Sequence, residues 1–428
     1  MLRRVVEVRE DEVGPMLWAC LYFFLLLAAY FVIRPLRDEM GIAGGVRNLP
    51  WLFTGTLLGM LLVHPLFTAL VSKLSRRRFI PLAYHFFAGN LLVFWVLFRI
   101  LPAPAGIWVG RAFFIWTSVF NLFVVSVFWS LMADRFRPAQ GARLFGFVAV
   151  GGTVGAVAGS ASTAILAQRV APLNLLLLSI VLLELAVGAA LKLMGSSIAG
   201  ENESRDPDSE SEQPVGGGVL DGIRLIVTSP YLLGIVAYML LYTITATFLY
   251  FQQAEIVASA LADRTARTVF FARVDLAVNV LTVVTQVFLT GRIVRRLGVA
   301  VSLAALPLVC VLGFAVVGLA PTLTLVAAFQ VLRRSSNYAI ARPCREMLYT
   351  VVPREAKYKA KNFIDTFVYR AGDQIGAWSY SLMGAVGLGA AATGIVTVPL
   401  SAVWLGVGLW LGRRQRTLAQ PPQRSLSL

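Results

Sequence analysis

Charged and amide side chains occur inside apolar stretches of this 428-residue sequence, and their chemistry needs the most explanation. Arg333, Arg334 and Asn337 fall within one apolar run. A charged group at depth in lipid costs about 2.5 to 3.5 kcal/mol on insertion scales unless it faces a cavity or a partner. We therefore expect at least one of the two arginines to bind an anionic group. The alternative is that both extend to the membrane interface along their methylene chains.

A second polar group follows a helical pattern. Asp275 and Asn279 are followed by Thr282 and Gln286, so the steps are four, three and four and all four side chains share one helix face. Such a stripe faces protein or water instead of lipid. It either binds substrate or forms hydrogen bonds between helices, because both uses require the same residue types.

A third set of polar side chains occurs at steps of four residues. Asp365, Tyr369 and Asp373 share a face, and Arg370 lies one position away from it. Either aspartate would neutralise a cavity arginine or carry a coupling proton. The alternative is a fixed ion pair between helices, which we favour for Asp365.

The first apolar run ends in IRPLRDEM, where the charges either act in a gate or anchor the helix at the interface. The predicted substrate-binding residues are Arg37, Asp275, Asn279, Arg333, Arg334, Asn337, Tyr369 and Asp373, and the predicted gating or ion-pair residues are Arg34, Asp38, Asp365 and Arg370.

Membrane-spanning helices must carry these residues. The sequence is 58% hydrophobic with a mean hydropathy of +0.75, well above an ordinary soluble domain. A span needs roughly 20 apolar residues. Such runs lie near 16–36, 49–71, 80–101, 107–132, 144–167, 173–194, 229–251, 268–291, 298–319, 321–341, 362–386 and 389–411. We predict an all-α polytopic membrane protein with twelve transmembrane helices.

The chain divides at a polar, acidic stretch between residues 195 and 218, which is typical of a disordered linker. We predict an N-terminal six-helix half at 1–194, a cytoplasmic disordered linker at 195–228, a C-terminal six-helix half at 229–412 and a cytoplasmic tail at 413–428. Similar basic, proline-containing turns follow the fourth and tenth spans. Two repeated six-helix halves are the layout of the major facilitator fold, in which substrate binds near the bilayer midplane.

The net charge of +16 comes largely from basic residues in short turns on one side of the predicted spans. This distribution argues against nucleic acid as a partner. The positive-inside rule places those turns and both termini in the cytoplasm. We expect a multi-pass integral protein of the bacterial inner membrane that is surrounded by lipid and is monomeric.

Several site classes are not expected. The three cysteines show no pairing or metal-binding spacing, and the two histidines are isolated, so we expect no metal and no cofactor. GGTVGAVAGS at 151–160 lacks the lysine of a phosphate-binding loop, and its small residues at four-residue steps predict close helix packing. The sequence has no HExxH or GxSxG motif, so we do not expect an enzyme.

One segment indicates a family. REMLYTVVPREAKYKAKNFID (345–365), followed by RAGDQIGA (370–377), resembles the part of the ATP/ADP translocase family that reads approximately KEMAYIPL, KGKAAID and then GKSGG. RPLRDEM at the end of the first span resembles that family's LKDTL. The resemblance implies a major-facilitator-like fold and transport of nucleotides, often by exchange.

The sequence also departs from the family pattern. The family's lysine in the first motif matches Arg37, which keeps the charge, but its lysine in GKSGG falls on Asp373, which reverses it. Acidic positions of the family's fourth and seventh spans fall near Thr117 and Ala246. These differences indicate a divergent member, for which another substrate is at least as well supported.

We therefore predict a secondary active transporter that moves a small anionic metabolite, nucleotide-like by the family resemblance, by alternating access. The alternative is a non-transporting membrane scaffold or assembly protein that retains the transporter fold.

Overall fold

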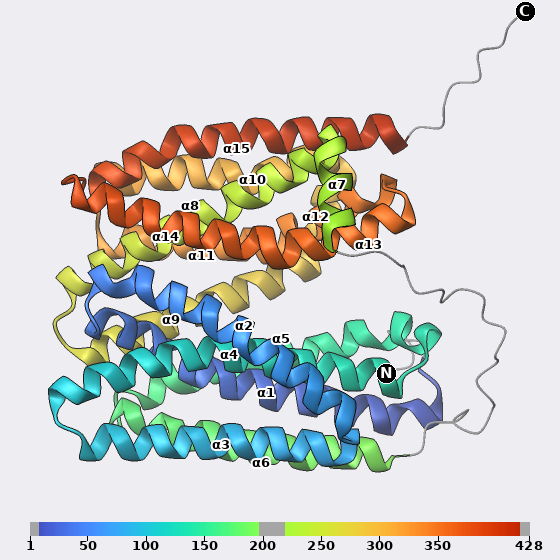
Figure 1. The fold of residues 1–428 in the computed structure, drawn as a ribbon, viewed down its shortest axis with the longest axis vertical. Helices are drawn as coiled ribbons and strands as arrows, with labels where there is room; N and C mark the ends of the chain where they lie inside the picture. Colours follow the sequence, from blue (N-terminus) through green and yellow to red (C-terminus); the bar gives the residue numbers. More distant parts are fainter. Residues whose placement is uncertain (1–7, 197–218, 420–428) are drawn as a thin grey trace, which may run out of the picture. The chain divides into compact units, whose positions relative to one another are not determined.

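The structure is a computed structural model that describes residues 8–196 and 219–419. Within these two ranges every regular element is a helix and no strand occurs (Figure 1). The predicted all-α class is confirmed. Most of the predicted linker and the end of the predicted tail lie outside the described residues.

The fold divides into two compact units: Met1–Ser209 with Leu261–Asn279, and Glu210–Ala260 with Val280–Leu428. The division falls inside helix α9 (Arg264–Thr285), so the first part of this helix belongs with the N-terminal helices. Asp275 and Asn279 therefore contribute to the first unit, although they lie in the C-terminal half of the sequence.

The first unit is built from long helices joined by short turns. They are α1 (Glu10–Ala43), α2 (Leu49–Lys73), α3 (Arg76–Ile100), α4 (Ala103–Arg135), α5 (Pro138–Leu166) and α6 (Leu175–Gly195), together with the start of α9. Helix α1 packs against α4, α5 and α6.

The second unit contains α7 (Val219–Thr228), α8 (Pro230–Ala260), the end of α9, α10 (Gly291–Leu319), α11 (Leu323–Ser336), α12 (Arg342–Leu348), α13 (Arg354–Phe363), α14 (Tyr369–Ala385) and α15 (Ala390–Ala419). Three π-helical turns interrupt the α-helical repeat: η4 (Gln286–Thr290), η5 (Asn337–Ala341) and η7 (Ile364–Val368). Such turns often occur at functional sites.

Nine helical segments of the described chain are long and apolar enough to cross a membrane. One of them, Arg264–Leu319, combines α9, η4 and α10, which the sequence divides into two spans. The count of twelve spans stays a prediction.

Glycines let α5 approach α1 closely. A Cβ atom on Gly155 would overlap the backbone carbonyl of Phe24, and Gly151 and Gly159 make the same approach to α1 one turn away on either side. The prediction that these small residues pack helices is confirmed, since 151–160 is continuous helix.

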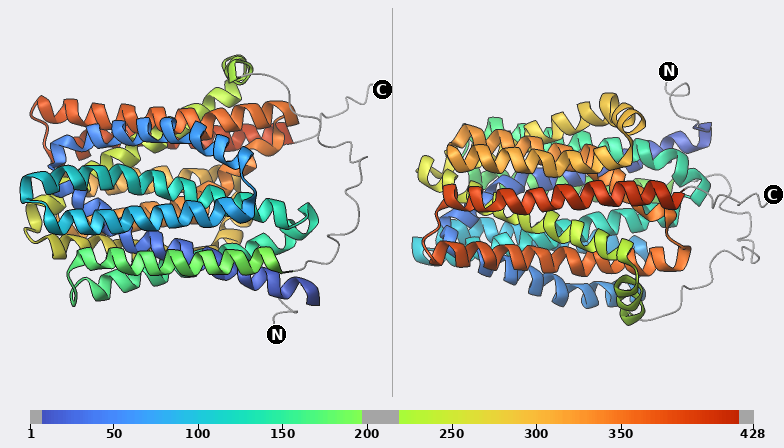
Figure 2. Two further views of the ribbon diagram at one scale, coloured as in Figure 1. Left: turned by 60° about the horizontal axis from the view of Figure 1, so that its bottom comes forward. Right: turned by 90° about the horizontal axis from the view of Figure 1, so that it is seen from above.

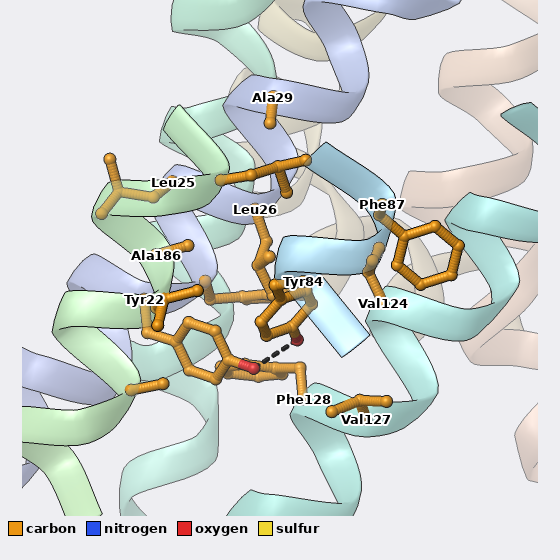
Figure 3. Packing of buried hydrophobic residues seen from close by; sticks show 14 of the residues in the cluster. Tyr22, Leu25, Leu26, Ala29, Tyr84, Phe87, Val124, Val127, Phe128 and Ala186 are labelled. Carbon is orange, nitrogen blue, oxygen red and sulfur yellow. Dashed lines mark hydrogen bonds between the residues drawn. The ribbon is translucent and has the colours of Figure 1, made fainter. Parts of the chain in front are cut away.

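An aromatic core holds α1, α3 and α4 together in the first unit (Figure 3). Tyr22 and Tyr84 are fully buried and hydrogen-bond to each other through their hydroxyl groups. Phe128 lies beside them and stacks on Phe23 at a centroid distance of 4.1 Å. One hydroxyl group donates to the other, so both buried oxygens take part in a hydrogen bond inside the apolar core.

The end of the predicted linker is ordered. Residues 219–228 form helix α7, which packs against α13, and Ile226 is buried. Apolar residues recur in VLDGIRLIVT at helical spacing, so this segment gains buried apolar surface when it folds.

Candidate functional site

The first group of candidate residues lies toward the C-terminal end of α1. Arg34 Nη1 donates to Asp275 Oδ1 at 2.9 Å, and the Asp275 side chain is only 2% exposed. The structure thus joins two predicted site residues that are far apart in sequence. Because an unpaired buried carboxylate is costly, the contact with Arg34 stabilises the fold around Asp275.

Arg37 is also paired. Its Nη1 lies 3.1 Å from Asp38 Oδ1, and its guanidinium carbon lies 3.9 Å from the centroid of the Phe114 ring. This position on an aromatic face provides a cation–π contact. Arg37 therefore already has an acidic and an aromatic partner.

Glu39 and Arg264 form a further pair that the sequence reasoning missed. Arg264 donates through Nε and Nη2 to the two carboxylate oxygens of Glu39 at 2.8 and 2.9 Å. Such a two-point contact is among the stronger ion-pair geometries. The only sequence signal is that Glu39 adjoins Asp38 in RDEM and that Arg264 lies in the charged turn DRTAR (263–267).

We name these six residues the α1 ion-pair cluster: Arg34, Arg37 and Arg264 with Asp38, Glu39 and Asp275. Three positive and three negative groups balance one another. This balance suits a brace between α1 and the start of α9 better than a site that attracts a free anion.

The rest of the polar stripe, in α9 and at the start of η4, also contacts protein. Asn279 Nδ2 donates to Ser160 Oγ at 3.3 Å, and both residues are buried. Gln286 Nε2 donates to the carbonyl of Tyr338 in η5 at 3.3 Å. These contacts are hydrogen bonds between helices, which was one of the two expected uses of the stripe.

The second unit presents a different arrangement around Arg333 of α11. Arg333 is 4% exposed, and its Nη2 donates to the backbone carbonyl of Tyr242 at 3.1 Å. Its guanidinium carbon lies 5.2 Å from the centroid of the Tyr242 ring. Its Nε has no hydrogen-bond partner, and no carboxylate of the described chain forms an ion pair with it. Arg333 is therefore a buried cation without an acidic partner.

Arg345 of α12 approaches the same tyrosine. Its guanidinium carbon lies 6.0 Å from the centroid of the Tyr242 ring, and it too forms no ion pair within the described ranges. Two guanidinium groups thus lie near one aromatic ring. Sequence reasoning missed Tyr242, which nothing in its apolar run distinguishes, and assigned Arg345 to a cytoplasmic turn.

Asn337 completes this group, which we call the Tyr242 cluster: Tyr242, Arg333, Asn337 and Arg345. Asn337 Nδ2 donates to the Tyr242 hydroxyl at 3.0 Å, while its Oδ1 is buried without a partner. The turn η5 begins at Asn337 and continues α11 into α12. The helix thus continues past residue 341, where the predicted span ends, and this continuation brings Arg345 near Arg333.

The remaining candidates take different positions in the second unit. Arg334 is half-buried, unlike its neighbour Arg333. The Tyr369 ring lies 6.2 Å from the Tyr242 ring. Asp373 pairs with Arg370 of the same helix at 3.3 Å. Asp365 is exposed and forms no ion pair within 4.0 Å in the described part of the chain.

The two clusters have different chemistry. The α1 ion-pair cluster is neutral overall, whereas the Tyr242 cluster contains two cations, an aromatic face and an unpaired amide oxygen. No group of three His, Cys, Asp or Glu side chains suited to a metal ion occurs among the described residues. The Tyr242 cluster is thus the better candidate for binding an anionic molecule.

Comparisons with known proteins agree with a transporter. A bacterial homologue of the iron transporter ferroportin, inward-facing, superimposes with a TM-score of 0.65 at 12% identity, covering 95% of this chain and 100% of that one. A bacterial homologue of the lysosomal transporter Spinster gives 0.60 at 14% identity, covering 97% and 100%. The nucleoside transporter NupG gives 0.56 at 13% identity, covering 95% and 100%.

At these identities the likeness establishes the major-facilitator-type fold alone. No curated protein matches the sequence. The family pattern described as TLC ATP/ADP transporter matches residues 103–415, which is more than half of the chain. The protein is thus an integral membrane transporter by family and fold, and this chain belongs to the TLC ATP/ADP transporter family.

Proposed function

We propose that the protein is a secondary active transporter that moves a small anionic, nucleotide-like metabolite by alternating access. Arg333 carries this proposal, because it is buried and has no carboxylate partner in the described chain. A buried charge without a partner is strongly unfavourable. A bound anion would neutralise this charge, so a binding site explains why a cation is buried at Arg333. The family description supports ATP or ADP as the first substrates to test.

The Tyr242 cluster supplies complementary groups for such a ligand. Arginine presents several donors in a planar fork that matches carboxylate and phosphate oxygens. In this proposal Arg333 and Arg345 hold those oxygens, and the free Oδ1 of Asn337 accepts a hydrogen bond from an N–H or O–H group of the ligand. Tyr242 keeps both guanidinium groups in position.

The α1 ion-pair cluster has a structural part in the proposed cycle. Its balanced pairs brace α1 against the start of α9, and their breaking or exchange would accompany a gating movement. We further propose that the protein resides in the bacterial inner membrane with both termini in the cytoplasm. The basic turns of the sequence support that orientation.

Uptake into proteoliposomes tests the proposal. Purified protein is reconstituted, and entry of labelled ATP, ADP and other phosphorylated metabolites is measured with and without unlabelled nucleotide inside. We expect Arg333→Ala to lower uptake at least about tenfold, because losing a charge-assisted contact costs on the order of 1.5 to 3 kcal/mol. Arg333→Lys should keep part of the activity, since it keeps the charge and loses the fork.

Arg414→Gln is the matched control, because Arg414 is exposed on α15 in the same unit. It removes the same charge and should leave uptake unchanged. Insertion and thermal stability of every variant are checked first. Full uptake by correctly folded Arg333→Ala would exclude the proposed role of Arg333.

The non-transporting scaffold makes the opposite prediction. In a scaffold the buried cation binds no ligand, so Arg333→Leu should raise the stability of the protein. Labelled anions should then enter the proteoliposomes no faster than they enter empty liposomes. Substrate-specific uptake by the wild type would exclude the scaffold.

A further inference from the structure

An ionisable pair lies on the exposed face of the first unit, away from both clusters described above. His85 Nδ1 of α3 lies 3.0 Å from a carboxylate oxygen of Glu184 in α6, and the two side chains are 54% and 43% exposed. Helices α3 and α6 pack side by side (Figures 1 and 2). The pair therefore joins two neighbouring helices on their outer surface.

The pair lies well inside the apolar part of both helices. His85 comes seven residues after Arg78, the last arginine at the start of α3, which is roughly 10 Å along the helix. Glu184 comes eight residues before Lys192, roughly 12 Å along α6. Histidine and glutamate are too short to extend to the headgroups as lysine does. Polar groups at this depth are costly in contact with lipid, so we expect another protein surface to cover them.

Two glycines on the same face point to close helix contact. Gly89 follows His85 by four residues and Gly188 follows Glu184 by four, so each lies one turn from the pair. A Cβ atom on either would meet no atom within 4 Å, so neither glycine serves packing inside this chain. Glycine weakens a helix by roughly 0.5 to 1 kcal/mol relative to alanine. It does allow a helix from outside to approach the backbone closely.

The chemistry of the face identifies its partner. Since His85 and Glu184 touch, they lie at the same depth. A two-fold axis along the membrane normal keeps depth unchanged, so it would bring the imidazole of one copy to the carboxylate of the other. A face with one base and one acid at equal depth is self-complementary under such an axis. We infer that the α3–α6 face binds a second copy of this chain, forming a homodimer within the membrane that replaces the monomer expected from the sequence.

Counting subunits in lipid tests this inference without reference to transport. Singly labelled full-length protein is reconstituted over a range of protein-to-lipid ratios, and photobleaching steps are counted for each particle. The wild type should shift from one step to two as density rises. His85→Leu combined with Glu184→Leu removes both polar groups together and leaves neither unpaired. This double variant should weaken dimerisation about tenfold or more.

The matched control removes another exposed ion pair of the same unit, Arg76 with Asp134, which lies at the cytoplasmic start of α3. Arg76→Gln combined with Asp134→Asn should dimerise like the wild type. When copper phenanthroline is added as the oxidant to native membranes, Leu185→Cys, on the exposed face of α6, should form a disulfide between two copies, whereas Leu58→Cys on α2 should not. A wild type that stays monomeric at every density, a leucine double variant that dimerises normally, or cross-linking to a different membrane protein would overturn the inference.

Discussion

Arginines in this chain have two contrasting environments. Arg34, Arg37 and Arg264 each contact a carboxylate within 3.1 Å, whereas Arg333 and Arg345 approach a tyrosine ring and form no ion pair within 4.0 Å in the described chain. The residue type is the same in both environments, but the neighbouring groups differ. In our proposal the paired guanidinium groups stabilise the fold, and those of Arg333 and Arg345 bind a ligand.

The ring of Tyr242 should contribute more to substrate affinity than its hydroxyl group does. Tyr242→Phe keeps the ring near both guanidinium groups and loses one hydrogen bond to Asn337, so we expect apparent substrate affinity to fall about threefold. Tyr242→Leu also removes the aromatic face and should lower affinity about tenfold or more. Titrating uptake against substrate concentration measures both. Equal losses in the two variants would contradict a role for the ring.

Breaking the Arg34–Asp275 pair should destabilise the first unit. Asp275→Asn leaves the Arg34 charge without its partner and should cost about 2 to 3 kcal/mol, which is below the full range for buried pairs because Arg34 is partly exposed. Adding Arg34→Gln should recover part of that loss. Thermal unfolding of the wild type, Asp275→Asn, Arg34→Gln and the double variant in detergent provides the double-mutant cycle. Purely additive effects would show that the pair does not couple.

The sequence could indicate which side chains needed explanation, but not their partners. Asp275 and Asn279 stand out as polar residues in an apolar helix at helical spacing. Their partners Arg34 and Ser160 lie 241 and 119 residues away, and no local pattern encodes such contacts. Glu39 and Arg264 were missed for the same reason, since each is unremarkable until the fold joins them.

At the scale of helices, small residues were the most reliable guide. The repeated glycines of 151–160 predicted close packing, and α5 does approach the backbone of α1 there. The π-helical turn η5 left no comparable signal. One extra residue in a helical turn does not change the apolar composition, so the apolar run at 321–341 indicates neither this turn nor the helix that follows it.

Substituting alanine for two different glycines of α5 should change stability in opposite directions. Gly155→Ala places a methyl group against the backbone of α1 and should cost about 1 to 3 kcal/mol through overpacking. Gly146→Ala is the control in the same helix, because its Cβ position is open. It should be neutral or slightly stabilising, since alanine is the better helix former. Thermal unfolding of each variant in the same detergent makes the comparison. Similar loss of stability in both would show that contact with α1 is not the cause.

At the scale of the molecule, composition and repeated basic turns were enough to predict an all-α membrane transporter of the major facilitator type. The family followed from one charged segment, and the match over 103–415 confirms it. The substrate does not follow in the same way, because the resemblance places Asp373 where the family has lysine, and Asp373 pairs with Arg370 in its own helix. In the proposed function, Arg333 and Arg345 bind the anion instead.

Ligand-induced stabilisation measures binding by Arg333 most directly. Purified wild type, Arg333→Gln and the control Arg414→Gln are unfolded thermally with nucleotides and phosphorylated metabolites at millimolar concentration. A ligand at 100 times its Kd stabilises the folded state by about 2.7 kcal/mol. We predict that at least one of these anions raises the melting temperature of the wild type and the control, and that Arg333→Gln loses most of this shift. The same shift in Arg333→Gln and in the wild type, or no shift with any anion, would contradict the account.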